Sequence, residues 1–134
     1  MKLLTIISHL LMEEQILEAK NKLGVDFIIT MPEDVKSIWS DISPYGPLPT
    51  DRLDKIIEWI EKESVEGDYV LVQGDFGATY YIVDYCFKSK RIPIYSTTKR
   101  EVEEFIKDGQ IEIKRIFKHI NFRKYMPHSY EREV

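Results

Sequence analysis

Two short polar segments each follow directly on an apolar run, and their residue types suit the binding of a phosphate group. The first is Gln73-Gly74-Asp75-Phe76-Gly77, after the run 69–72, and the second is Ser96-Thr97-Thr98-Lys99-Arg100, after the run 92–95. Glycine amides and a carboxylate in one segment, with three hydroxyls and two cations in the other, can contact phosphate oxygens and ribose hydroxyls. The two segments together predict a site for a phosphate-bearing ligand, with a nucleotide as the first candidate.

The first polar segment leads into an apolar stretch of helical length, residues 78–87. Free N–H groups and the helix dipole favour an anion at such a helix start. We therefore expect Ala78 to lie against the ligand and Thr79, one turn into the helix, to face it. Asp75 has two interpretations, because its carboxylate can cap the helix or bind ribose hydroxyls.

Two histidines are candidates for proton transfer near neutral pH. His9 and its neighbour Ser8 directly follow the first apolar run, residues 2–7. His119 lies with Arg123 in the basic and aromatic stretch KHINFR. Each histidine also has a plain structural interpretation, His9 as a loop residue and His119 as a side chain packed at a sheet edge.

The apolar periodicity predicts the elements that must position these residues. We expect strands at 2–7, 26–30, 69–72 and 92–95, and helices at 13–23, 32–39, 51–63 and 78–87. Their alternation is typical of an α/β fold, a Rossmann-like mainly parallel sheet flanked by helices. The carboxyl ends of parallel strands share one edge of a sheet, where such sheets bind ligands, so both polar segments are expected there as loops.

Residues 102–125 differ from the rest of the chain. Ile111 and Ile113 alternate with polar positions, and Asp108-Gly109 is a turn signal between two candidate strands. This predicts a C-terminal β-hairpin, with a helix over residues 101–107 as the alternative. The tail from about residue 127 is expected to be frayed.

Length and composition exclude several classes of protein. With 134 residues the chain is expected to form a single domain. A lone cysteine, no HExxH and no paired carboxylates at ligand spacing predict no metal site, and no cofactor is expected.

Asp75-Phe76-Gly77 matches the magnesium motif of protein kinases, but the chain is far too short for a kinase. No apolar run reaches membrane-spanning length and no signal peptide is visible, which predicts a cytoplasmic protein.

The charge is unevenly distributed along the chain. Residues 1–87 hold 7 Lys and Arg against 16 Asp and Glu, whereas residues 88–124 hold 11 against 5. The net charge of −4 argues against a binder of long nucleic acid. A basic final third suits a small, highly charged ligand in one local site, and a solvated basic face is the alternative.

Four blocks carry a resemblance to a known family: Ser8-His9, Gly67 to Tyr80, Ile92 to Arg100, and Phe117 to Tyr125. With them the chain resembles the small CRISPR-associated Rossmann-like ring nucleases of type III systems, which are CARF-related and of the Csx type. The similarity runs to about Tyr125, and the second and third blocks are its specific parts.

The resemblance implies a metal-independent ring nuclease that linearises a cyclic oligoadenylate, first of all cyclic tetra-adenylate, and so switches off antiviral signalling. It also implies a homodimer with the ligand across or near the two-fold axis. The alternatives are a non-catalytic sensor or sponge for the same ligand and an interaction domain without one. The expected catalytic residues are His9, Lys99, Arg100 and His119. The expected ligand-binding residues are Ser8, Gln73, Gly74, Asp75, Phe76, Gly77, Ala78, Thr79, Ser96, Thr97, Thr98 and Arg123.

Overall fold

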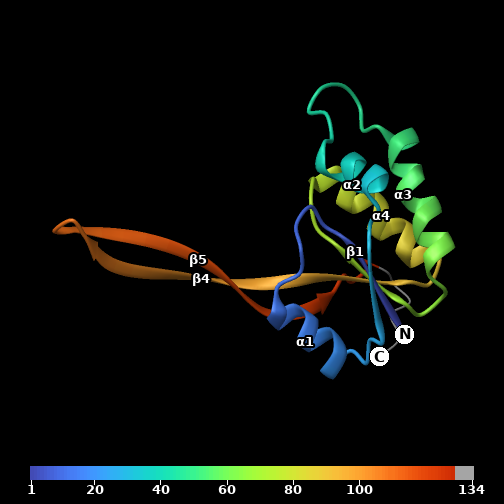
Figure 1. Ribbon diagram of the computed structural model, residues 1–134. Coiled ribbons are helices and arrows are strands. Elements are labelled where there is room, and N and C mark those ends of the chain that lie inside the picture. Colours follow the sequence, from blue (N-terminus) through green and yellow to red (C-terminus); the bar gives the residue numbers. More distant parts are fainter. Residues whose placement is uncertain (129–134) are drawn as a thin grey trace.

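The computed structural model describes residues 1–128 and contains one curled five-stranded sheet (Figure 1). The strands are β1 (Lys2–Ile6), β2 (Phe27–Thr30), β3 (Tyr69–Val72), β4 (Ile92–Lys107) and β5 (Gln110–Lys124). The helices are α1 (Glu13–Asn21), α2 (Glu33–Ser40), α3 (Thr50–Glu63) and α4 (Phe76–Lys88). The strand order is β2-β1-β3-β4-β5, with β1 to β4 parallel and β5 antiparallel to β4. The predicted α/β sheet with a C-terminal hairpin is confirmed. Residues 129–134, the larger part of the predicted frayed tail, lie outside the described residues.

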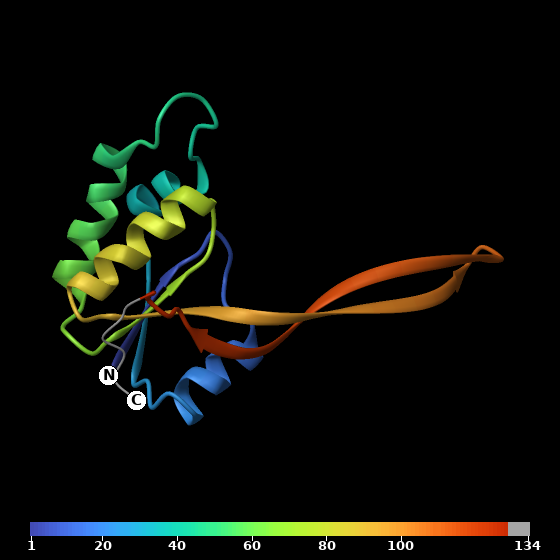
Figure 2. The same cartoon turned by 180° about the vertical axis from the view of Figure 1, so that it is seen from behind.

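Helices cover both faces of the sheet (Figures 1 and 2). Because successive side chains of a strand point to opposite faces, each strand contributes to two cores. Leu3, Leu71 and Ile94 pack with Ala19 of α1 on one side. The larger core on the other side joins the sheet to α2, α3 and α4. Its fully buried members include Leu4, Ile6, Val70, Val72, Leu53, Ile56, Ile60 and Ile82.

Cys86 belongs to this larger core and is completely buried. Burial raises the pKa of its thiol to about 12, so the thiol stays protonated at neutral pH and is a packing residue. Among residues 1–128, no helix combines the length and the apolar character needed to cross a membrane.

Strands β4 and β5 extend far beyond the body of the protein as a twisted two-stranded ribbon (Figure 1). We call residues 99–118 the arm. The turn at its tip is Asp108-Gly109, and both residues have positive φ, 52° and 76°. Two such residues between paired strands form the type I′ turn that suits the strand twist, and the predicted hairpin turn is confirmed. The alternative helix over residues 101–107 is wrong, since these residues pair with β5 throughout.

Residues 96–100 are not the loop that the sequence predicts. They continue β4 without interruption, and each pairs with a residue of β5. The antiparallel partner satisfies their backbone groups, so β4 does not have to end where its parallel neighbour β3 ends. Consecutive residues of this segment therefore point to opposite faces of the ribbon, which decides what each can contact.

Candidate functional site

The carboxyl edge of the sheet contains the switch point of the fold. The strand order reverses between β1 and β3, and in such sheets the crevice outside these two strand ends is the usual ligand site. Ser8 and His9 follow β1, and the segment 73–77 follows β3. Ser8, His9 and residues 74–77 are all exposed. Ser8-His9 and residues 73–77 therefore lie at the same edge of the sheet.

Gln73 is held by three hydrogen bonds and has a structural role. Its backbone N–H donates to the carbonyl of Ile6 at 3.2 Å, and its own carbonyl accepts from Nε1 of Trp39 at 3.0 Å. Its side-chain Oε1 accepts from the backbone N–H of Ser96 at 2.9 Å. Gln73 thus ties β1, α2 and β4 together at the edge and fixes the start of the loop that follows.

Gly74 is packed against Trp39, and this contact leads to a stability prediction. A Cβ atom at Gly74 would lie 2.8 Å from the indole ring, whereas a Cβ at Gly77 would lie 3.4 Å from a methyl group of Leu48. We expect Gly74→Ala to lower the free energy of unfolding by about 1–3 kcal/mol, because the ring is buried and cannot easily move.

Gly77→Ala is the matched control, since Gly77 lies in the first turn of α4, where alanine is a better helix former. It should be neutral or slightly stabilising. Urea unfolding of both variants measures the difference in their free energies of unfolding. Equal values would show that the indole ring can shift to accommodate the added methyl group without loss of stability.

The N-terminus of α4 faces solvent at the same edge. Oδ2 of Asp75 accepts a hydrogen bond from the backbone N–H of Ala78 at 3.0 Å, so the capping interpretation of Asp75 is the one observed. The Ala78 side chain is buried, and Phe76 is 95% exposed. Oγ1 of Thr79 is buried and has no hydrogen-bond partner among the described residues. A buried hydroxyl of this kind is available to a bound water or to a ligand group.

The base of the ribbon adds aromatic and cationic groups next to α4. Tyr95 and Tyr125 are in ring contact, with centroids 4.7 Å apart, and the Arg123 guanidinium lies 5.9 Å from the Tyr95 ring centroid. Burial raises the pKa of Tyr125 to about 12, and its hydroxyl donates to the Val72 carbonyl at 2.6 Å. A shallow pocket of about 350 Å³ lies here, lined by Gln73, Gly74, Phe76, Thr79, Tyr95 and Tyr125.

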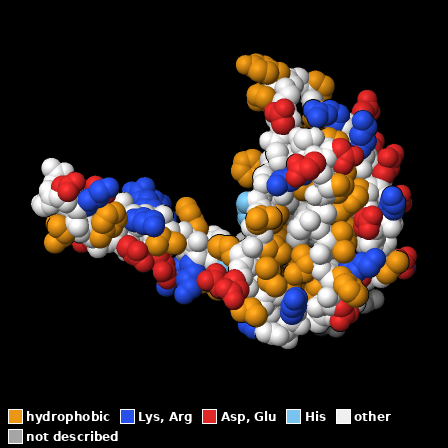
Figure 3. All heavy atoms as spheres, in the orientation of Figure 1, with side chains coloured by type: hydrophobic (Ala, Val, Ile, Leu, Met, Phe, Trp, Pro, Cys, Tyr) orange, Lys and Arg blue, Asp and Glu red, His pale blue; other side chains and the backbone are white. Residues whose placement is uncertain are grey.

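Two lysines continue this face of the ribbon onto the arm. Tyr95 alternates with Thr97 and Lys99 along β4, and their cross-strand partners are Arg123, Asn121 and Lys118. Directly paired residues share a face, so Lys99 and Lys118 lie side by side beyond the pocket. We call the pocket together with Thr97, Lys99, Lys118 and Arg123 the carboxyl-edge surface. Figure 3 shows the hollow between the arm and the body.

The remaining predicted residues of β4 and β5 lie on the opposite face of the ribbon, which is a correction. Ser96, Thr98 and Arg100 alternate with Tyr95, Thr97 and Lys99, and Thr98 and Arg100 pair with His119 and Phe117. The expectation that Ser96, Thr98, Arg100 and His119 join Lys99 in one site is wrong for a geometric reason. A strand separates its neighbours between two faces, whereas a loop would not.

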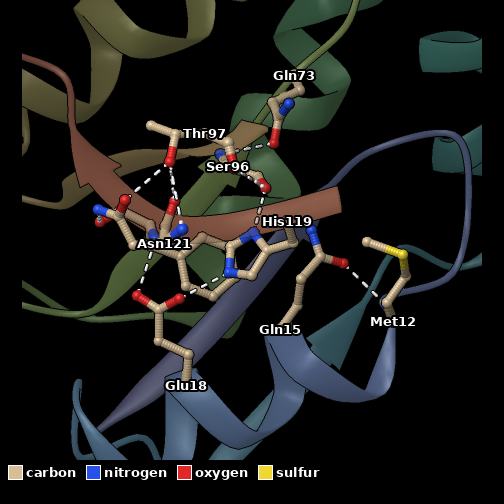
Figure 4. Close-up of polar contacts among 9 residues, drawn as sticks. Met12, Gln15, Glu18, Gln73, Ser96, Thr97, His119 and Asn121 are labelled. Atoms are coloured by element: carbon tan, nitrogen blue, oxygen red, sulfur yellow. Dashed lines mark hydrogen bonds and ion pairs between the residues drawn. The ribbon is translucent and has the colours of Figure 1, made fainter. Parts of the chain in front are cut away.

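His119 is buried in a polar network that joins the ribbon to α1 (Figure 4). Its Nε2 donates to Oε1 of Glu18 at 2.6 Å, and its Nδ1 accepts from the Ser96 hydroxyl. The second oxygen of Glu18 accepts from the backbone N–H of Phe122 at 2.8 Å. Hydroxyl, imidazole and carboxylate follow one another as in a serine hydrolase triad. Ser96 and His119 are only 9% and 6% exposed, so the network attaches the ribbon to α1.

His9 differs from His119 because its side chain is exposed at the carboxyl edge. Its Nδ1 lies 3.0 Å from the carbonyl oxygen of Leu10. A carbonyl only accepts hydrogen bonds, so Nδ1 carries the proton in this contact, and in the neutral ring Nε2 then presents a lone pair. His9 is therefore the histidine that is suited to accept a proton from a ligand.

Sequence reasoning missed Glu18, Tyr95, Asn121, Lys118 and Tyr125. Glu18 lies more than a hundred residues before His119, and no local pattern predicts that pair. The pairing of Lys118 with Lys99 follows from the hairpin register once the turn is placed at 108–109. Within residues 1–128 no group of three or more His, Cys, Asp or Glu side chains is arranged to hold a metal ion.

Comparison with known proteins gives one family. Residues 1–123 match the family model described as the uncharacterized protein MJ1673 family. The chain is 44% identical over 127 residues to uncharacterized protein MJ1673 of Methanocaldococcus jannaschii, covering 95% of this chain and 98% of that protein. No solved structure matches the chain.

Proposed function

The chain belongs to the MJ1673 family, and we propose that it binds a cyclic oligoadenylate, first of all cyclic tetra-adenylate, on its carboxyl-edge surface. The proposal includes a cytoplasmic location. The motif resemblance to the CRISPR-associated ring nucleases of type III systems suggests the ligand. The observation that carries the proposal is the meeting of the α4 N-terminus, the Tyr95 and Arg123 pair, and the two lysines at the switch point of the sheet.

Each part of the surface matches one part of such a ligand. The α4 N-terminus and the cations Lys99, Lys118 and Arg123 suit phosphodiester oxygens. Phe76 and Tyr95 present aromatic rings on which an adenine base can stack. The Thr79 hydroxyl, which lines the same pocket, supplies a hydrogen bond for a ribose or base atom.

The lysine pair is a second argument for an anion. Lys99 and Lys118 are directly opposite each other in the ribbon, and both are exposed. Like charges at opposite positions destabilise a strand pair. A bound phosphate removes this repulsion, so the pair is disfavoured in the free protein and favoured in the complex.

We propose further that the bound ring is opened without a metal ion. The ribose 2′-oxygen attacks the adjacent phosphorus and the bond from phosphorus to the 5′-oxygen breaks, which leaves a 2′,3′-cyclic phosphate and a 5′-hydroxyl. Nε2 of His9 takes the 2′-hydroxyl proton, the leaving 5′-oxygen takes a proton from water, and Lys99 stabilises the charge that develops on the phosphoryl oxygens. His119 has no direct part in this step, because both of its ring nitrogens are engaged in the buried network.

The alternative is a sensor or sponge that binds the same ring without opening it. It is favoured by the burial of His119, which leaves His9 as the one predicted histidine that is exposed at the edge.

One experiment separates the two candidates. The protein, in molar excess, is mixed with cyclic tetra-adenylate in EDTA, binding is measured by calorimetry, and products are separated by chromatography. Linear products with cyclic phosphate ends that disappear in His9→Ala support ring opening. Intact ligand that binds tightly supports the sponge, and absence of binding would exclude both.

A further inference from the structure

The two faces of the arm differ sharply in character. On one face the cross-strand register places five apolar side chains, those of Val102, Ile106, Ile111, Ile113 and Phe117. We call this the apolar arm face. The other face carries seven charged residues, Lys99 and Lys118 among them, and two apolar ones, Phe105 and Ile116. The division follows from the strict alternation of side chains along both strands.

The apolar arm face is uncovered. Its five apolar side chains are between 57% and 79% exposed, and hydrophobic side chains are visible along the arm in Figure 3. The same face of the ribbon is covered by α1 at the base, where Phe122 and Ala19 belong to one buried core. A two-stranded ribbon is at best marginally stable in water, and an exposed apolar stripe of this length marks an interaction surface.

We propose that the apolar arm face binds the same face of a second copy of this chain, with the two arms antiparallel. The resulting homodimer is isologous, because each copy contributes the same residues to the contact. The arms form a two-layered structure in which each ribbon covers the apolar side chains of the other, and the charged faces point outwards to water.

The position of α1 decides the direction of the second arm. Since α1 lies on the same face at the base of the ribbon, parallel arms would bring the two α1 helices into collision. Antiparallel arms instead place the tip of each ribbon at the base of the other. Two further apolar side chains are exposed there, Leu17 of α1 at 51% and Ile120 at 50%. They extend the surface that the partner's tip covers.

The two charges at the centre of the apolar arm face are self-complementary. Arg115 pairs with Val102, and Glu104 pairs with Ile113 at the next position towards the tip. The midpoint of the apolar stripe falls between these two pairs. A two-fold axis at the midpoint places each Arg115 beside Glu104 of the other copy, so these two central charges meet opposite partners, while Arg100 lies at the base end of the face beside Phe117. No unlike partner protein is needed to satisfy them.

The contact is large enough for a dimer. Seven exposed apolar side chains, each burying on the order of 100 Å², approach the roughly 800 Å² per partner of a standard interface. In this dimer the carboxyl-edge surfaces of the two copies lie apart instead of meeting at the two-fold axis. Ligand binding and dimerisation are therefore separate properties and can fail separately.

The test is the mass of the protein in solution, measured by light scattering and sedimentation without any ligand. The wild type is expected to be a dimer, and Ile113→Asp a monomer. Lys114→Asp is the matched control. It places an aspartate at the next residue of β5, which lies on the charged face, and should leave the dimer intact. Far-ultraviolet circular dichroism confirms that both variants are folded, which is expected because both positions are exposed.

A charge exchange tests the antiparallel register. Arg115→Glu and Glu104→Arg should each raise the dimer dissociation constant about tenfold or more, because each creates a like-charge contact, and the double variant should restore it. A monomeric wild type overturns the proposal. So does a dimer that survives Ile113→Asp, or a double variant that is no better than the singles.

Discussion

Replacing Glu18 with alanine is expected to lower the free energy of unfolding by about 2–5 kcal/mol, the largest effect of any single polar substitution proposed for this protein. The carboxylate accepts hydrogen bonds from the His119 ring at 2.6 Å and from the Phe122 backbone at 2.8 Å. Without it, two donors in the α1–β5 contact have no acceptor. Urea unfolding followed by circular dichroism gives the change.

Glu14→Ala is the control for this prediction. Glu14 is an exposed glutamate on the same helix, so the substitution changes helix propensity and net charge in the same way. It should cost a few tenths of a kcal/mol from the lost interaction with the helix dipole. If the two variants were equally stable, the buried network would contribute nothing, and α1 would be held by apolar contacts alone.

The second large effect concerns the ligand. Lys99→Ala is expected to weaken cyclic tetra-adenylate binding about tenfold, the loss of one charge-assisted contact to phosphate, and Lys99→Ala with Lys118→Ala about a hundredfold. Lys99→Ala alone should not destabilise the protein, because it removes the repulsion between Lys99 and Lys118. Calorimetric titration and thermal unfolding of one preparation measure both quantities.

Arg100→Ala is the matched control for Lys99→Ala. It removes a cation from the next residue of β4, but one on the opposite face of the ribbon. Binding should stay within about twofold of the wild type, a difference of about 0.4 kcal/mol. Equal losses in Lys99→Ala and Arg100→Ala would mean that the general charge of the arm attracts the ligand and that the carboxyl-edge surface does not bind it.

Most elements of the fold could be predicted because their apolar patterns are those of buried segments. Residues 69–72 form a continuous apolar run, as a strand covered on both sides requires, and 51–63 has apolar residues on one helical face. The turn at Asp108-Gly109 was predictable because two positive φ angles favour these residue types. In each case burial or backbone geometry restricts the residue type.

The extent of β4 could not be predicted, because an exposed ribbon has no such restriction. Ser96, Thr97 and Thr98 are compatible with a turn as well as with a strand, and nothing in Lys99-Arg100 indicates a pairing partner some twenty residues later. The wrong prediction of a loop at residues 96–100 also made the predicted site wrong. A loop could have brought the side chains of residues 96–100 together. In the strand, Lys99 lies on the same face of the ribbon as Tyr95, and Arg100 lies on the opposite face.

The register irregularity between Thr97 and Thr98 determines the chemistry of the whole arm. Thr97 pairs with Asn121 and Thr98 with His119, so Ile120 is an extra residue of β5 without a place in the ladder. The arm therefore has something equivalent to a reading frame, because this one extra residue decides which side chains of β5 lie on which face. If Ile120 took a regular place, every side chain of β5 from residue 110 to residue 119 would change sides, and Lys118 would turn away from Lys99 while His119 lost Glu18. Deleting Ile120 would keep this frame, whereas deleting one residue between 111 and 118 would shift it.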